Sequence, residues 1–357
     1  MISMMVLMVC SRRVEFPALY QWRARTQSTG AIGKGTAGQR VMLPKRAGEG
    51  IILDKRHIAI ILNPGSGRDR DDDPGEQAVR LLAEAGHEAK LYRFSKGQPL
   101  AKTVARALSA GAQTVVAAGG DGTICGVAGA LSGTGVAMGV LPLGTFNYFA
   151  RSLKLPEDLS EAIGVVVNGR ALAVRTGTIN GKVFLNNTSV GRYPEILANR
   201  EVVYKRWGRS RIAAYWSVLK TLATLRRPLE LSIDADGEVH RYRTPLIFVL
   251  NNAFQMEQMG LEGHDALNEG KLAMYISPDS GRLGQVRQAL ALALGIAQEK
   301  RDFLFLSAHK FQITGRRRRH RIALDGEREK MSTPLTIESH IDTLRVIVPE
   351  DYNREIR

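Results

Sequence analysis

Cysteine is scarce in this chain, because only Cys10 and Cys125 occur among its 357 residues. Two cysteines form at most one disulfide, so a disulfide-built secreted fold is not indicated and a reducing cytoplasm is the expected compartment. Long apolar runs are also missing, since no stretch approaches the roughly 18 residues that a membrane-spanning helix requires. The length and a hydrophobic content of 44% instead predict a globular protein with two domains, each of which buries its own core.

Acidic residues are few relative to basic ones. The chain has 50 Lys and Arg against 35 Asp and Glu, a formal net charge of +15. Such an excess suits an anionic partner: a phospholipid surface, a nucleic acid or a phosphorylated small molecule. Charge alone does not choose among these three.

Residues 1–55 differ in composition from the rest of the chain. A short apolar run at residues 1–9 precedes Arg12 and Arg13, whereas a secretory signal peptide carries its positive charges before the apolar region. Residues 27–50 are rich in Gly, Thr, Ser, Lys and Arg and show little periodicity. We expect residues 1–55 to be a flexible basic extension or sequence upstream of the true start, with a transit peptide as the alternative.

Residues 56–164 alternate between short apolar runs and amphipathic segments. Strands are expected at residues 57–62, 88–94, 113–118 and 136–141, and helices at 77–85, 100–109, 123–131 and 145–153. Alternation at this spacing is typical of a parallel sheet with helices on both faces. The pattern therefore predicts an N-terminal α/β domain with a doubly wound parallel sheet.

Residues 165–349 are rich in strand signals, and residues 350–357 form a tail. Strands are expected at 176–179, 182–185, 229–234, 238–242, 245–250, 271–276, 309–314, 321–324, 335–339 and 343–348, with one long helix at 284–300. Asn180-Gly181 and Asp236-Gly237 are hairpin turn signals. This half is predicted to be an antiparallel β-sandwich.

The sharpest local motif is Gly119-Gly120-Asp121-Gly122-Thr123, which follows a buried strand and opens a helix. Glycines bring bare backbone N–H groups close to an anion, and the helix N-terminus adds a favourable partial positive charge. Asp121 cannot bind phosphate directly, but it would orient a Mg2+ ion or hold the shape of the loop. The alternative is an ordinary strand-to-helix turn in which Asp121 or Thr123 caps the helix.

Two more glycine-bearing loops follow strands of the same predicted sheet. They are residues 63–67 (NPGSG) after the first strand and residues 142–147 (PLGTFN) after the fourth. Ligands of open parallel sheets bind beyond the carboxyl ends of the strands. Three such loops at one sheet edge favour a nucleotide phosphate site over simple turn chemistry.

Together with Leu324-Asp325-Gly326-Glu327, these motifs resemble the diacylglycerol kinase catalytic-domain family, which includes soluble bacterial lipid kinases and sphingosine and ceramide kinases. The resemblance runs from about residue 57 to residue 348. It implies ATP and Mg2+ as cofactors and a lipid alcohol as phosphate acceptor. It also allows a homodimer.

The resemblance assigns roles to individual residues. The implied nucleotide-binding residues are Asn63, Ser66, Gly67, Ser95, Gly119, Gly120, Asp121, Gly122, Thr123, Thr145 and Asn147. Ser95 stands near the place of a family threonine, although the local match is loose. The implied catalytic residues are Asp121 and Glu327, of which Glu327 would take the proton from the lipid hydroxyl.

The triplet Asp-Gly-Glu occurs twice, at residues 236–238 and 325–327. The first copy lies between two alternating strands, where Asp-Gly is ordinary turn chemistry. The second copy would also be a turn by itself, and the resemblance is what makes Glu327 the candidate base.

Two positions depart from the family pattern. Cys125 and Gly126 stand where the family usually has Asn and Glu, which weakens any ligand contact expected from that part of the helix. Bacterial members carry a second metal site at an Asp-Gly pair, and here Glu269 replaces the aspartate. Glu269 is therefore the candidate metal ligand.

Basic residues form two clusters, at residues 316–321 and at Lys205, Arg206, Arg209 and Arg211, the second of which is close to Trp207, Tyr215 and Trp216. A kinase that acts on a membrane lipid must dock on an anionic surface, so we expect peripheral membrane association. The alternative is a solvated loop. Nucleic-acid binding is not expected, because no recognised nucleic-acid module accompanies the charge.

The sequence thus predicts an ATP-dependent lipid kinase in phospholipid metabolism, most simply one that converts diacylglycerol to phosphatidic acid. NAD kinase shares the Gly-Gly-Asp-Gly-Thr loop and the two-domain plan, but a different loop is expected after its fourth strand. A non-catalytic lipid- or nucleotide-binding protein on the same fold is the other alternative.

Overall fold

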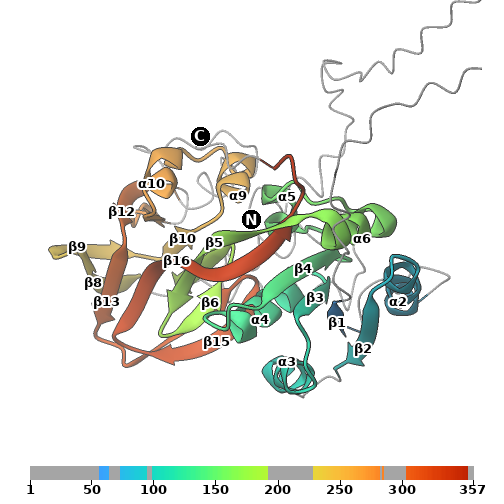
Figure 1. Cartoon of the computed structure of the whole chain (residues 1–357). Helices are drawn as coiled ribbons and strands as arrows, with labels where there is room; N and C mark the ends of the chain where they lie inside the picture. Colours follow the sequence, from blue (N-terminus) through green and yellow to red (C-terminus); the bar gives the residue numbers. More distant parts are fainter. Residues whose placement is uncertain are drawn as a thin grey trace, which may run out of the picture. The chain divides into compact units, whose positions relative to one another are not determined.

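The computed structural model describes residues 56–63, 73–94, 99–191, 228–281, 284 and 303–352. These residues lie in one compact unit, and two β-sheets organise it (Figure 1). In this described part of the chain, no helix is both long and apolar enough to cross a membrane.

The first four strands form the parallel part of the larger sheet, in the order β2-β1-β3-β4. Their bounds are β1 His57–Leu62, β2 Glu88–Arg93, β3 Thr114–Gly119 and β4 Ala137–Pro142. Every residue of β3 is buried, which explains its continuous apolar sequence, since a central parallel strand is covered on both faces. The prediction of a doubly wound parallel sheet is confirmed.

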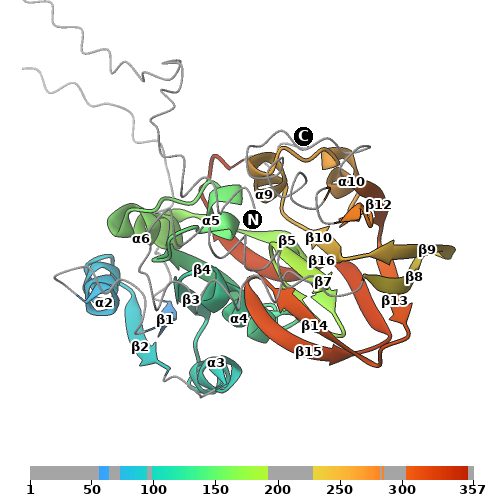
Figure 2. The same ribbon diagram turned by 180° about the vertical axis from the view of Figure 1, so that it is seen from behind.

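Helices cover both faces of the parallel strands, because successive side chains of a strand point to opposite sides. α3 (Leu100–Ser109) and α4 (Asp121–Leu131) pack on the face that carries Ala59 and Ile61. α2 (Pro74–Glu84) and α6 (Leu159–Asn168) pack on the face that carries Ile58 and Ile60. Figure 2 shows α2, α3 and α6 around these strands from behind.

Helix α6 was not among the predicted elements. Asp158 caps its N-terminus, where the carboxylate accepts the backbone N–H groups of Ser160 (2.9 Å) and Glu161 (3.1 Å). A β-carbon at Gly139 of β4 would lie 2.9 Å from the Val166 side chain, so this glycine permits the close packing of α6 on the sheet. The domain boundary predicted between residues 164 and 165 falls inside this helix and stays a prediction.

One long strand, β16 (Leu335–Val348), connects the parallel and antiparallel parts of the larger sheet. It pairs in parallel with β4, and antiparallel with β5 (Arg170–Ile179) and β13 (Lys310–Gly315). The two strands predicted at residues 335–339 and 343–348 are therefore one strand. Its register shifts between His340 and Leu344, and this irregularity breaks the alternation on which the sequence prediction relied.

The second sheet is antiparallel and has the order β12-β11-β10-β7-β14-β15. Its strands are β7 Asn187–Gly191, β10 Leu246–Leu250, β11 Leu272–Ile276, β12 Leu304–Ala308, β14 Arg319–Leu324 and β15 Glu327–Ser332. One hydrophobic core joins the inner faces of the two sheets, with Phe311 and Ile337 from the larger sheet and Val249 and Ile322 from the smaller. This packing confirms the predicted β-sandwich, and Figure 2 shows β7, β10, β14 and β15 of the smaller sheet.

The remaining described elements are β6 Lys182–Phe184, β8 Leu229–Ala235, β9 Glu238–Thr244, α5 Tyr148–Ser152, α9 Ala253–Gln258 and α10 His264–Asn268. Both predicted hairpin turns are confirmed, because Asn180-Gly181 and Asp236-Gly237 join paired antiparallel strands with positive φ at all four residues. Helices α9 and α10 and strands β7, β12 and β15 were not predicted. The predicted helix at residues 284–300 lies outside the described residues, apart from residue 284.

Candidate functional site

The carboxyl ends of β1, β3 and β4, from which the three predicted loops start, lie next to one another. Asn63, directly after β1, donates its backbone N–H to the Ala118 carbonyl oxygen (3.2 Å) and its side-chain amide to Thr123 Oγ1 (3.3 Å). Leu143, directly after β4, donates its backbone N–H to the Gly119 carbonyl oxygen (3.0 Å). The described residues of these loops therefore converge as expected. Ser66, Gly67 and Ser95 lie outside the described residues.

The glycines of these loops allow the backbones to approach closely. A β-carbon at Gly144 would lie 2.6 Å from the Gly120 α-carbon, and one at Gly119 would lie 2.7 Å from the Thr123 side chain. A larger residue at Gly144 would force the loops after β3 and β4 apart, and one at Gly119 would displace the Thr123 side chain. Gly120 caps α4, so the N–H groups at the start of an 11-residue helix open at this point, and such N–H groups favour an anion.

Asp121 is the first residue of α4, and its carboxylate is largely enclosed. Oδ1 accepts long hydrogen bonds from the Phe149 backbone N–H (3.4 Å) and the Asn186 side-chain amide (3.5 Å). Burial raises the pKa of the Asp121 carboxyl, and the negative charge of Asp325 acts in the same direction. A carboxylate in such surroundings gains from a nearby cation.

The loop after β4 contains two residues that the sequence predicts to bind the nucleotide, and their environments differ. Asn147 is buried in a left-handed conformation (φ 50°), and its side chain accepts the Gly144 N–H (3.1 Å) and donates to the Pro142 (3.3 Å) and Gly144 (3.1 Å) carbonyl oxygens. It therefore holds the shape of the loop. Thr145 is exposed, so its hydroxyl is accessible to a ligand.

Glu327 lies at the same place although it comes from the other half of the chain. Asp325-Gly326 forms a hairpin turn between β14 and β15, with φ of 43° and 94°, and Glu327 is the first residue of β15. A β-carbon at Gly122 would lie 3.3 Å from Glu327 Oε1. The second Asp-Gly-Glu copy thus places its glutamate against the first turn of α4.

Asp325 connects this hairpin to the segment between β6 and β7. Its carboxylate accepts the backbone N–H groups of Leu185 (2.7 Å), Asn186 (2.9 Å) and Asn187 (2.8 Å). Removal from water raises the pKa of the Asp325 carboxyl, whereas these three N–H groups lower it. Three donors on one carboxylate fix the position of the turn that carries Glu327.

Two asparagines that sequence reasoning missed complete the network. Asn252 donates its side-chain amide to Asn186 Oδ1 (2.7 Å), and Asn186 donates its own to Asp121. Both asparagines are buried. Each asparagine follows an apolar strand sequence. This position was a signal that the side-chain amide is buried, and a buried polar group needs a hydrogen-bond partner.

The first copy of Asp-Gly-Glu, at residues 236–238, has a structural role. Asp236 accepts the backbone N–H groups of His309 (2.9 Å) and Lys310 (2.8 Å), and Glu238 is exposed on β9. The interpretation of residues 236–238 as turn chemistry agrees with this placement.

The two departures from the family pattern have different outcomes. Cys125 is buried in α4, where Sγ donates to the Val183 carbonyl oxygen (3.4 Å) and burial raises the pKa of the thiol well above its usual value. The thiol is therefore neutral and inert. Glu269 is exposed and forms an ion pair with Lys271 (2.7 Å).

A metal site at Glu269 has little support from its surroundings. The ion pair with Lys271 is the largest cause that lowers the pKa of Glu269. Across the described ranges, no group of three or more His, Cys, Asp or Glu residues is arranged to hold a metal ion. The single carboxylate does not by itself fit a dedicated metal site, and the metal role of Glu269 stays a prediction.

The chain is similar to known proteins. Residues 57–179 match the family model of the diacylglycerol kinase catalytic domain. A diacylglycerol kinase of Bacillus subtilis (strain 168) is 28% identical over 277 residues, which cover 76% of this chain and 90% of the relative.

Over residues 57–179 the chain is thus similar to the diacylglycerol kinase catalytic domain. The similarities support a lipid kinase as the class of enzyme. A Cronobacter sakazakii protein named "Probable lipid kinase YegS-like" is 39% identical over 139 residues, which cover 38% of this chain and 45% of that protein.

Two solved structures have a similar fold. A diacylglycerol kinase from Bacillus anthracis (strain Sterne) has a TM-score of 0.60 at 21% identity, and the match covers 85% of this chain and 99% of that one. A second structure from the same organism has a TM-score of 0.65, also at 21% identity, with 85% and 97% of the two chains covered. The two-part architecture described above is therefore the architecture of these kinases.

Proposed function

We propose that this protein transfers the γ-phosphate of ATP to the hydroxyl group of diacylglycerol, which gives phosphatidic acid and ADP. The observation that carries the proposal is the position of Glu327, whose carboxylate faces Gly122 in the first turn of α4. A proton acceptor thus lies next to a loop suited to phosphate groups. The names of the bacterial relatives support diacylglycerol as the acceptor.

ATP phosphates would bind to the backbone N–H groups of residues 119–123 and to the N-terminal end of α4. The exposed Thr145 would donate a hydrogen bond from the opposite loop. Asn63 supports the loop through Thr123. Ser66, Gly67 and Ser95 are proposed from the sequence to lie around the nucleotide, and they are outside the described residues.

The enclosed carboxylate of Asp121 fits a Mg2+ ion that arrives with ATP. Mg2+ is commonly held by one or two carboxylates together with phosphate oxygens, so a single protein ligand is sufficient. When bound, the ion would neutralise part of the phosphate charge. Burial raises the pKa of Asp121, and a cation at this position would offset that penalty.

The chemical step is an in-line transfer. The lipid hydroxyl oxygen forms a bond to the γ-phosphorus, and the bond from that phosphorus to the β,γ-bridging oxygen breaks, so that ADP leaves. The hydroxyl proton passes to a carboxylate oxygen of Glu327. The Asp325 hydrogen bonds to residues 185–187 hold the hairpin in place during this transfer.

The lipid acceptor requires the enzyme to work at a membrane surface. Arg316, Arg317 and Arg318 in the turn between β13 and β14, and Arg319 at the start of β14, are exposed, and such a cluster is attracted to anionic headgroups. The second basic cluster, at residues 205–211, lies outside the described residues. Peripheral association from the cytoplasmic side is thus part of the proposal, and a homodimer remains a prediction.

The deciding experiment is transfer of labelled γ-phosphate from ATP to a lipid panel in mixed micelles that contain anionic phospholipid. The panel would include diacylglycerol, a glycerol-linked phospholipid and a sphingoid base, with NAD as a soluble acceptor. We expect labelled phosphatidic acid from the wild type. Glu327→Gln should reduce its rate by about a hundredfold or more, the usual contribution of a general base.

Glu238→Gln is the matched control, because Glu238 occupies the same place in the first Asp-Gly-Glu copy. It should retain the wild-type rate. Label on NAD would favour a NAD kinase, whereas ATP binding without label on any acceptor would favour a non-catalytic protein. Label on another lipid alone would replace diacylglycerol and leave the kinase chemistry intact.

A further inference from the structure

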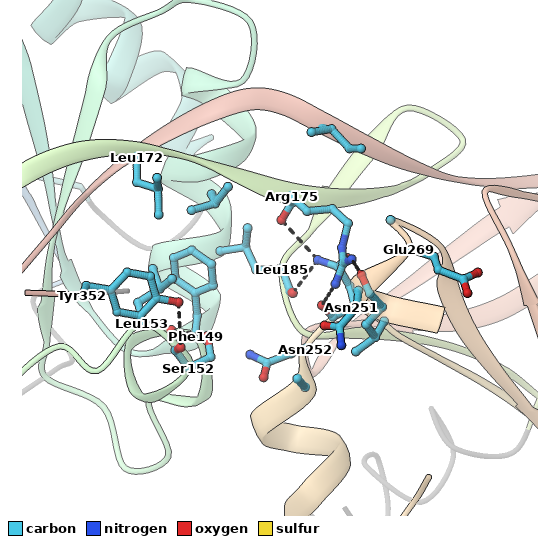
Figure 3. A pocket seen from close by; sticks show the side chains of 16 residues that line it. Phe149, Ser152, Leu153, Leu172, Arg175, Leu185, Asn251, Asn252, Glu269 and Tyr352 are labelled. Carbon is cyan, nitrogen blue, oxygen red and sulfur yellow. Dashed lines mark hydrogen bonds between the residues drawn. The ribbon is translucent and has the colours of Figure 1, made fainter. Parts of the chain in front are cut away.

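A cavity of about 410 Å³ lies beside α5, between that helix, β5 and the segment that carries α9 and α10 (Figure 3). Small-molecule sites commonly have volumes of about 300–1,000 Å³, so this cavity can hold part of a ligand. None of the nucleotide-binding residues predicted from the sequence lines it. Its role is therefore separate from binding the ATP phosphates.

The two sides of the cavity differ in chemistry. Phe149, Leu153, Leu172, Val174 and Leu185 give it a continuous apolar wall that belongs to the hydrophobic core. Figure 3 shows Leu172, Leu153 and Phe149 on one side and Arg175 and Asn251 on the other. An apolar ligand group would bury itself against the first side.

The polar side of the cavity is largely satisfied by its own contacts. Arg175 donates from Nε to Asn251 Oδ1 (2.8 Å) and from Nη1 to the Leu267 carbonyl oxygen. The Asn251 side-chain amide donates to the Leu185 (3.0 Å) and Arg175 (3.3 Å) carbonyl oxygens. Because these groups form hydrogen bonds with one another, an apolar ligand could bind beside them without breaking any of these hydrogen bonds.

The cavity shares a wall with the reacting centre. The Phe149 ring lines the cavity while its backbone N–H donates to Asp121. Asn252 also lines the cavity, and it binds Asn186, which donates to Asp121. A ligand chain in the cavity would therefore lie one residue layer from the site of phosphate transfer.

The rim of the cavity carries an exposed apolar side chain. Ile341, at the irregular part of β16, is 57% exposed. A β-carbon at Gly270 would lie 3.3 Å from Ile341 Cδ1, so the two residues border the same side of the rim. On another side, Tyr352 donates its hydroxyl to the Ser152 carbonyl oxygen (3.4 Å). An exposed isoleucine beside an apolar cavity suits the entry of an apolar chain.

We propose that this cavity receives an acyl chain of the lipid acceptor. The inference rests on the proposed function, since it places the acyl chain of the same substrate whose hydroxyl reacts near Glu327. The apolar wall would bury the chain, and the shared wall at Phe149 and Asn252 would orient the glycerol end toward Asp121.

The test compares kcat/KM for diacylglycerols with acyl chains of increasing length, from eight to eighteen carbons. Leu172→Trp and Ala253→Trp fill the cavity from two different walls. In both variants, the ratio of kcat/KM for the longest chain to that for the shortest should fall by about tenfold, as expected when two methylene groups are no longer buried. Val239→Trp is the control, because Val239 is an exposed apolar residue of β9 outside the cavity lining, and it should keep the wild-type ratio.

An unchanged ratio in both folded cavity variants, or an equal loss for every chain length, would overturn the inference. Crosslinking provides a readout without activity: a diacylglycerol with a diazirine at the far end of one acyl chain should label the wild type within residues 149–153 or 172–175. Label only elsewhere would also overturn it. Were no lipid phosphorylated, the proposed function would fail, and the crosslinked peptide would still decide where the chain binds.

Discussion

Gly122 faces Glu327 so closely that a β-carbon on the glycine would lie 3.3 Å from Glu327 Oε1. The glycine belongs to the first turn of α4, and the glutamate begins β15 in the other half of the molecule. The predicted phosphate-binding loop and the candidate base therefore meet at a residue that has no side chain. A glycine at this position leaves room for the Glu327 carboxylate.

Gly122→Ala separates activity from stability. Alanine stabilises a helix by about 0.5–1 kcal/mol relative to glycine, so the melting temperature should stay equal or rise. The new methyl group would displace the Glu327 carboxylate, and kcat for lipid phosphorylation should fall by about tenfold to a hundredfold. Thermal unfolding and kcat measured on the same preparation provide the comparison.

Gly129→Ala is the control in the same helix. Its β-carbon would make an ordinary contact, 3.6 Å from Val183 Cβ. We expect a similar gain in stability with kcat unchanged. A wild-type kcat in Gly122→Ala would contradict the proposed place of Glu327 in the reaction.

Asp325→Asn should weaken both the fold and the chemistry. An asparagine has only one side-chain oxygen, so it cannot accept all three N–H groups of residues 185–187. Loss of a buried acceptor costs about 1–3 kcal/mol in the free energy of unfolding. Because the hairpin that carries Glu327 loosens, kcat should fall while KM for ATP changes little.

Asp236→Asn tests whether the effect belongs to the second Asp-Gly-Glu copy. Asp236 accepts two backbone N–H groups in an exposed turn. This variant should lose some stability and keep kcat. Equal kcat losses in the two variants would mean that Asp325 has no special role in positioning Glu327.

The fold of the α/β half could be predicted from the sequence because its strands and loops have local sequence patterns. Buried parallel strands such as β3 are continuous apolar runs, and the glycine loop follows β3 directly in sequence. Strand β15 was missed for a physical reason: it lies at the edge of its sheet and carries Glu327, Arg328, Glu329 and Lys330. Charges protect an edge strand from aggregation and hide its strand character.

The partners of the asparagine network could not be predicted from local sequence, although an amide at the end of an apolar strand was a signal that each asparagine needs a partner. Asn186 contacts Asp121, 65 residues away in sequence, and Asn252 contacts Asn186, 66 residues away. Such contacts form only in the tertiary structure. Strand β7 was missed in the same way, because Asn187, Thr188 and Ser189 are polar residues of a loop-like composition although all three are buried. Tertiary partners override local propensity at these positions.

Asp121→Asn should stabilise the protein without ligand while it abolishes activity. Burial raises the pKa of Asp121 in the folded state, so the folded protein holds this proton to a higher pH than the unfolded chain does. Stability is therefore lost as pH rises from the unfolded-state pKa through the folded-state pKa. At neutral pH the variant lacks the buried charge, and its melting temperature should exceed that of the wild type.

The pH dependence provides the check on this prediction. The difference in melting temperature should vanish in acid, where Asp121 is protonated in both states of the wild type. Asp158→Asn removes the same charge from a surface N-cap and should give no such gain, because Asn and Asp are equivalent caps. A lower melting temperature for Asp121→Asn at neutral pH would show that the charge is already compensated.

The arginine turn between β13 and β14 should determine binding to anionic vesicles. Arg316 forms an ion pair with Glu230 at 3.5 Å, and all four arginines at residues 316–319 are exposed. Each cation near an anionic surface contributes about 1 kcal/mol, so replacing all four by glutamine should lower vesicle partitioning by about a hundredfold or more. Cosedimentation with phosphatidylserine vesicles measures this loss, and phosphatidylcholine vesicles should show none.

A second quadruple variant controls for net charge alone. It replaces four exposed cations elsewhere by glutamine: Arg80, Lys102, Lys154 and Arg345. If vesicle binding depends on the arginine turn, this variant should lose at most a few-fold in partitioning, because its substituted charges lie outside the turn. Surface charges more than about 10 Å apart are largely screened at physiological salt. Equal losses in the two variants would assign membrane attraction to the overall charge of +15 and not to the turn.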